Sequence, residues 1–140
     1  MAYIDTSVLA AYYCPERLSP KVQKALAGLG EATISPLVEL ELHSAVAMKV
    51  RLHDMDVPTA TRSLAAFRVH LEEGLYRMVP VQAREYSLAC QWLAAFSMPL
   101  RAPDALHLAA VFANGLTLLT SDKDLARAAK HFGVRHELIR

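Results

Sequence analysis

The stretch Tyr3-Ile4-Asp5-Thr6-Ser7-Val8-Leu9 sets the pattern of the whole chain, because an aspartate closes a very short apolar run and a helical pattern follows it. We predict a buried strand over residues 2–5. A short helix should then run from Val8 to Tyr13 and end before Pro15, since the residue preceding a proline disfavours the helical conformation. The junction between the two consists of residues that commonly cap helices: Asp5, Thr6, Ser7.

The same alternation of strand and helix continues along the chain. Further strands are predicted at 32–35, 76–81, 116–120 and 134–139. Helices are predicted at 21–29, 37–52, 59–73, 82–96, 104–113 and 121–132, with Ser19 and Ser35, each followed by proline, as N-caps. Alternating strands and helices favour a three-layer α/β/α fold with a short parallel sheet of four or five strands. A length of 140 residues fits a single domain, 1–140.

The composition limits the classes of function. Hydrophobic residues make up 54% of the chain, which indicates a large core or an apolar face kept for a partner. The net charge of +1 excludes nucleic-acid binding by bulk charge, so any such binding must come from local patches. Cys14 and Cys90 form no CxxC pair, and we expect both to be buried and reduced.

No segment has the pattern of a membrane or export signal. The N-terminus lacks the charged and apolar regions of a signal peptide. The apolar stretches 88–100 and 105–119 are interrupted by polar residues and are shorter than a bilayer span. We therefore expect a cytoplasmic protein with no membrane partner.

Three further acids occupy positions comparable to that of Asp5, near the junctions of predicted elements or near the start of helices: Glu41, Asp104, Asp122. Ligands of open parallel sheets bind beyond the carboxyl ends of the strands. If the first and fourth strands are neighbours, Asp5 and Asp122 meet there, and Asp104 begins the helix that leads into the fourth strand. Each aspartate also has a simpler explanation as an N-cap, which stabilises a helix by about 1 kcal/mol without any metal.

Glu41 is harder to explain as a structural residue. On a helix over 37–52, the helical wheel places Glu41 inside an apolar stripe formed by Leu37, Ala45, Met48 and Leu52. Glu39 shares a side with His43 and is the more solvated acid. An ionised carboxylate on a buried face is costly unless it is paired or bound to metal. We interpret Glu41 as functional; pairing with an arginine, or a different helix frame, remains open.

An oxygen-rich cluster of acids predicts a particular chemistry. Carboxylates that share a pocket repel one another, and a cation removes the repulsion. Oxygen ligands suit Mg²⁺ or Mn²⁺, one ion or two, and such a site fits phosphodiester hydrolysis by a metal-activated water.

Several neighbours of the acids are candidates for supporting functions. Thr6, Ser7 and Thr120 either hydrogen-bond the acids or contact a phosphate, or they serve only as cap and strand residues. Asp124 either assists the site or faces solvent. Basic residues are candidates for phosphate contacts: Arg101, Lys123, Arg127, Lys49, Arg51. His107, three residues after Asp104, is expected to be a satisfied core histidine, with a ligand or a proton shuttle as the alternative. Trp92 and Phe96 are expected in the core.

Four segments resemble the motifs of PIN-domain nucleases, in the family's order and across nearly the whole chain. They are residues 3–7, 35–46, 101–110 and 120–125. The chain length and the sequences of the motifs are similar to those of VapC-type toxins of toxin–antitoxin pairs. The resemblance implies an endoribonuclease dependent on Mg²⁺ or Mn²⁺, usually a homodimer, that is inhibited by a cognate antitoxin. It implies that the metal and catalytic residues are Asp5, Glu41, Asp104, Asp122.

Two other functions remain open at this point. One is a metal-dependent nuclease that acts on DNA, and the other is a non-catalytic, PIN-like protein-binding module whose acids only cap helices. Within the second motif, Glu39 is an alternative to Glu41, although the sequence pattern Glu-Leu-x-x-Ala favours Glu41.

Overall fold

A five-stranded parallel sheet, in the order β3-β2-β1-β4-β5, forms the centre of the molecule in the computed structural model, which describes residues 1–140. Its strands are β1 (Ala2–Ile4), β2 (Ala32–Ile34), β3 (Tyr76–Met78), β4 (Thr117–Thr120) and β5 (His136–Leu138). In the central strand, Tyr3 pairs with Thr33 of β2 on one side and with Leu118 of β4 on the other. The first and fourth strands are therefore neighbours, which places the ends of β1 and β4 side by side.

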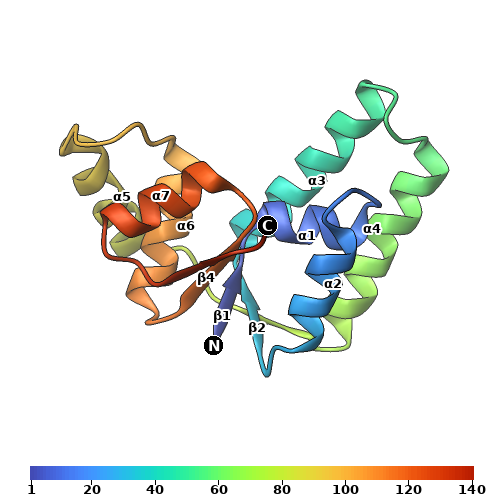
Figure 1. Ribbon diagram of the computed structural model, residues 1–140, viewed down its shortest axis with the longest axis horizontal. Helices are drawn as coiled ribbons and strands as arrows, with labels where there is room; N and C mark the ends of the chain where they lie inside the picture. The colour runs from blue at the N-terminus through green and yellow to red at the C-terminus, as the bar shows by residue number, and fades with distance from the viewer.

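Seven helices cover the two faces of this sheet. They are α1 (Thr6–Tyr13), α2 (Ser19–Ala27), α3 (Pro36–Arg51), α4 (Val57–Glu72), α5 (Ala83–Ala94), α6 (Ala102–Ala113) and α7 (Lys123–His131). Helices α1–α4 lie on one side and α5–α7 on the other, and α3 and α4 form a projecting hairpin (Figure 1). The predicted three-layer α/β/α fold is confirmed. None of the helices combines the length and the apolar character needed to cross a membrane.

Most element boundaries agree with the prediction, and the differences have local causes. Strand β3 stops at Met78 rather than continuing to Val81, because Pro80 cannot donate to a sheet ladder. Ser19 is the first residue of α2 and not its cap. Its hydroxyl instead accepts from the Glu16 N–H at 2.9 Å and donates to the Ala11 carbonyl at 2.7 Å.

The core lies between the sheet and its helices, and Tyr3, Ile4 and Leu118 are fully buried in it. Trp92 packs against this core and stacks on Phe132, with ring centroids 4.9 Å apart. The prediction for Phe96 was wrong: helix α5 ends at Ala94, and Phe96 follows in a left-handed conformation with 91% of its surface exposed. Cys14 is buried as predicted, whereas Cys90 faces solvent on α5.

Candidate functional site

Asp5 lies where β1 meets α1, and it is buried, with 3% of its surface exposed. Its Oδ1 accepts from the Val8 N–H at 3.2 Å and from the Ser7 hydroxyl at 2.6 Å, and its Oδ2 accepts from the Thr120 hydroxyl at 2.7 Å. Burial raises the pKa of Asp5 above its ordinary value, and these hydrogen bonds only partly oppose the shift. Asp5 is thus a helix cap, but capping alone does not require burial or the bond to β4.

Hydroxyl groups connect the ends of β1 and β4. Besides binding Asp5, Thr120 accepts from the Asp122 N–H at 3.0 Å, and Ser7 accepts from the Ser121 N–H at 3.0 Å. Ser7 and Thr120 therefore contact Asp5 as proposed from the sequence, and through them its carboxylate is joined to the loop that carries Asp122.

Asp122 is the N-cap of α7. Its Oδ1 accepts from the N–H groups of Asp124 at 2.8 Å and Leu125 at 3.2 Å. Because both bonds use Oδ1, the second oxygen of Asp122 accepts no hydrogen bond. The cap explains the position of this residue and still leaves half of its carboxylate available to a ligand.

Glu41 is half-buried, but the predicted reason was wrong. The buried face of α3 consists of Val38, Leu42 and Val46, whereas Met48 and Leu52 of the predicted apolar stripe are exposed. Glu41 lies beside the core face because α3 is rotated differently from the frame we assumed. Its partner is also not an arginine.

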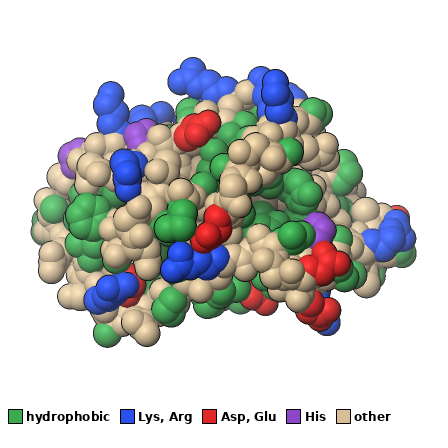
Figure 2. Space-filling model, turned by 90° about the horizontal axis from the view of Figure 1, so that it is seen from below, with side chains coloured by type: hydrophobic (Ala, Val, Ile, Leu, Met, Phe, Trp, Pro, Cys, Tyr) green, Lys and Arg blue, Asp and Glu red, His purple; other side chains and the backbone are tan.

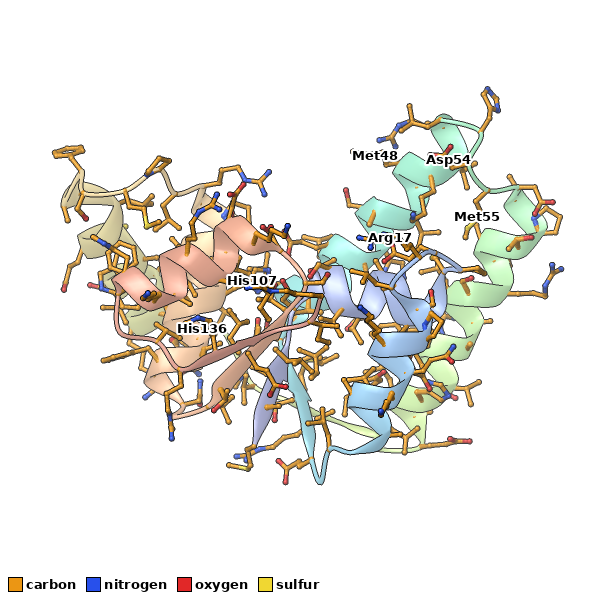
Figure 3. The ribbon with its side chains drawn as sticks, in the orientation of Figure 1. Arg17, Met48, Asp54, Met55, His107 and His136 are labelled. Carbon is orange, nitrogen blue, oxygen red and sulfur yellow. The ribbon has the colours of Figure 1, made fainter.

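A histidine and a threonine hold Glu41 by a single oxygen. Its Oε1 accepts from the Thr6 hydroxyl at 2.8 Å and from Nε2 of His107, which is buried on α6. Figure 3 shows His107 in the middle of the molecule, projecting towards the start of α1 and α3. Burial acts to raise the pKa of Glu41, but the bonds from His107 and Thr6 outweigh burial and lower it. Oε2 is left without a hydrogen bond.

His107 is held in turn by Tyr3, and Tyr3 by Ser35; we did not predict either residue to be near the site. Its Nδ1 lies 2.8 Å from the hydroxyl of Tyr3, which lies 2.7 Å from the hydroxyl of Ser35. Since the Glu41 carboxylate accepts, Nε2 carries a hydrogen. His107 is a satisfied buried histidine, as expected, yet the group that satisfies it is a candidate site residue. The position of His107 three residues after Asp104 was the one signal in the sequence.

Asp104 lies in the first turn of α6 and is not its cap. The N-cap of α6 is Arg101, and no side chain bonds the exposed N–H groups of that end. The Asp104 side chain is 19% exposed, and its Oδ2 accepts from Nε of Arg101 at 3.3 Å. The capping alternative for Asp104 was therefore wrong, and Oδ1 has no hydrogen-bond partner.

A cleft of about 580 Å³ brings together two of the four candidate catalytic acids, Asp104 and Asp122. Its lining residues come from the loop before α6 and from the starts of α6 and α7: Met98, Pro99, Leu100, Arg101, Asp104, Asp122, Asp124, Arg127. Asp5 and Glu41 do not line it. Asp124, whose side chain is 82% exposed, forms an ion pair with Arg127 at its edge. Of the other candidate cations, Arg101 lines this cleft and Lys123 does not, while Lys49 and Arg51 lie on α3.

A family model for the PIN domain matches residues 2–131. The chain belongs to the PIN-domain family. No curated protein matches it.

Solved structures resemble this PIN domain over most of its length. Mycobacterium tuberculosis VapC20, a sarcin–ricin-loop-cleaving toxin, is 20% identical with a TM-score of 0.73, covering 91% of this chain and 95% of the other. Rickettsia felis VapBC2, bound to a promoter DNA fragment, is 16% identical with a TM-score of 0.71 and complete coverage of both chains. A Klebsiella pneumoniae toxin–antitoxin complex is 19% identical with a TM-score of 0.65, covering 90% and 91%. At these identities the likeness shows the fold.

The donors of this PIN domain suit a hard divalent cation by their chemistry. Glu41, Asp104 and Asp122 each keep one carboxylate oxygen out of the hydrogen-bond network. As the side chains lie, no three His, Cys, Asp or Glu residues form a ready-made metal cluster. Mg²⁺ keeps several waters and takes only one or two protein carboxylates directly, so a partly water-bridged arrangement fits these residues.

Proposed function

We propose that this PIN domain is an endoribonuclease dependent on Mg²⁺ or Mn²⁺ and the toxin of a toxin–antitoxin pair. The observation that carries the nuclease proposal is the pair Asp104 and Asp122, which line one cleft with unused carboxylate oxygens. Asp5 follows β1 at the same carboxyl end of the sheet, and the Thr120 hydroxyl joins its carboxylate to the Asp122 N–H. Glu41 is bonded by Thr6, the residue after Asp5. The family and the toxins among the similar structures support the proposed class.

In this mechanism Asp5, Glu41, Asp104 and Asp122 would hold the cation, directly or through water. The cation would supply a water of lowered pKa and neutralise charge on the phosphoryl group. Because its pKa is lowered, Glu41 stays ionised at neutral pH, and its Oε2 can accept a hydrogen bond from a water. Thr6 fixes the carboxylate of Glu41, and Ser7 and Thr120 fix that of Asp5. Arg101 is available to contact a phosphate entering the cleft.

The proposed partners are the RNA substrate, a cognate antitoxin and a second copy of the chain. Structures of toxin–antitoxin complexes among the similar proteins support the antitoxin. On this chain, exposed apolar residues of α3 and its C-cap are available for protein contacts: Leu40, Met48 and Leu52. We propose that the protein acts in the cytoplasm.

The test compares nucleic acids and metals directly. Total RNA and single-stranded DNA are incubated with the protein in Mg²⁺, in Mn²⁺ or in a chelator. We expect metal-dependent RNA cleavage that Asp104→Asn abolishes without lowering the melting temperature, because Asp104 caps no helix. Equal cleavage of DNA would favour the DNA nuclease. If neither nucleic acid is cleaved and no metal binds, the chain is a non-catalytic binding module.

A further inference from the structure

Three basic residues follow one another along one face of α7. Lys123, Arg127 and Lys130 are spaced at i, i+4 and i+7, so they lie on the same side of the helix. The opposite side is buried and includes Leu125 and Ala129. The basic face begins one residue after the Asp122 cap, next to the acidic cleft, and runs away from it along the helix.

This basic face forms one wall of a second groove. The groove has a volume of about 390 Å³ and lies between α7 and β5 and the residues after β5: Lys123, Ala126, Arg127, Lys130, His136, Leu138, Arg140. Four of its seven lining residues are cationic and none is acidic. The main-chain oxygen of Arg140 accepts from Nζ of Lys21, which adds a further cation at that end.

The positive charge in the groove is mostly unneutralised. Lys123, Lys130 and Arg140 form no ion pair with an acid, and Arg127 pairs only with Asp124. The chain as a whole carries a net charge of only +1, and basic and acidic side chains are interspersed on the face shown in Figure 2. A groove with four cationic side chains and no acidic one is therefore a local concentration of positive charge. A protein without bulk positive charge needs such a patch to bind nucleic acid.

The groove and the acidic cleft adjoin each other at one residue. Arg127 lines both cavities. A polymer that crosses the cleft can therefore pass over Arg127 into the groove. Because the cleft contains Asp104, Asp122 and Asp124, it repels phosphates that no cation neutralises, whereas the groove attracts them.

We propose that the α7–β5 groove binds the phosphodiester backbone of single-stranded RNA next to the bond that is cleaved. The proposal rests on the proposed function, since RNA is the substrate assumed for the cleft. At 1.5 Å per residue, Lys123 to Lys130 spans about 10 Å, so the basic face is long enough to contact more than one phosphate of a strand. Interactions of this kind position the strand without reading its bases.

The test uses two double variants that each remove two positive charges. K130Q/R140Q changes the groove at residues away from the acids, and R62Q/R68Q removes two exposed charges from α4 on the other side of the sheet. Binding of a fluorescein-labelled single-stranded RNA is followed by anisotropy in EDTA, over a series of salt concentrations. Equal melting temperatures for both variants establish that they are folded.

We expect K130Q/R140Q to bind the RNA about tenfold more weakly at low salt. Its log–log salt slope should be shallower by about 1.4, because each phosphate that is no longer neutralised reduces the slope by about 0.7. R62Q/R68Q should bind as the native protein does. In cleavage assays with metal, K130Q/R140Q should raise KM and leave kcat unchanged. Indistinguishable binding and salt slopes for the two variants would overturn the proposal.

The same experiment separates this inference from the proposed function. If K130Q/R140Q weakens RNA binding but the native protein cleaves no RNA with any metal, the groove stands and the nuclease proposal fails. If the native protein cleaves RNA and K130Q/R140Q leaves KM and the salt slope unchanged, the nuclease stands and the groove proposal fails.

Discussion

The buried carboxylate of Asp5 accepts three hydrogen bonds, yet burial still raises its pKa. A raised pKa in the folded state means that the native protein binds this proton more tightly than the unfolded chain does. The stability that Asp5 contributes is thus complete below its unfolded pKa, about 3.9, and is lost as the pH rises through the folded value. At neutral pH the charge of Asp5 is a cost that a bound cation would remove.

Asp5→Asn tests this position. Asparagine still caps a helix, and the hydroxyls of Ser7 and Thr120 can reorient towards the amide. We expect metal-dependent RNA cleavage to fall by more than about 100-fold, beyond the usual loss for a group outside the ligand set. In EDTA at pH 7 the melting temperature should stay level or rise, because a buried charge is gone. Native cleavage rates in the variant would contradict the assigned metal-binding role.

His107 is expected to act through Glu41 by fixing its carboxylate. His107→Leu removes the bond to Oε1, and we expect Mn²⁺ affinity and cleavage to fall by about 10- to 100-fold, as for other groups that orient metal ligands. His107→Gln keeps an N–H donor in similar reach and should recover much of both. Manganese titration by electron paramagnetic resonance measures the affinity separately from turnover. A glutamine variant no better than leucine would mean that His107 only fills the core.

Among the helices, α5 is held at its start by a capping box. Glu85 is buried and accepts from the Gln82 N–H at 3.0 Å and from Nε of Arg84 at 2.9 Å. Burial acts to raise the pKa of Glu85, but the bonds from Arg84 and Gln82 outweigh burial and lower it. The stability that Glu85 contributes is therefore present above its unfolded pKa, about 4.3, and is lost as the pH falls through the folded value.

Glu85→Ala should lower the free energy of unfolding by about 1–2 kcal/mol at pH 7, because the Gln82 N–H loses its partner. The difference from the native protein should shrink as the pH falls through the lowered folded pKa of Glu85, where the carboxylate takes up a proton. Urea denaturation at a series of pH values measures both effects. Glu72→Ala, an exposed change near the end of α4, serves as the control and should alter stability little at any pH. A constant difference at every pH would contradict the contribution of the charge.

For the molecule as a whole, metal binding and folding are linked. A cation that binds only the native state adds about 2.7 kcal/mol at a concentration of 100 times Kd. We expect Mg²⁺ or Mn²⁺ to raise the melting temperature by several degrees in the native protein and by much less in Asp5→Asn. K⁺ at matched ionic strength controls for screening. An equal shift in both proteins would place the cation away from Asp5.

The order of strands and helices, and the positions of Asp5 and Asp122 within it, could be predicted from the chain alone. Both residues were identified as acids that follow strands and start helices, and both cap helices in the structure. These features depend on residues close together in the chain: apolar runs, prolines, and side chains that bond N–H groups two or three positions away. Local structure of this kind can be predicted from residues that are close together in the sequence.

The assembly of the candidate site, by contrast, depends on tertiary packing. The bonds from Tyr3 to His107 and from His107 to Glu41 span 104 and 66 residues. They depend on the rotation of α3 about its axis, which packing of Val38 and Leu42 sets and which a helical wheel misassigned. The basic groove likewise exists because β5 pairs beside β4 and brings Arg140 to α7. Helix rotation and strand order are properties of the packed core, so local sequence does not fix them.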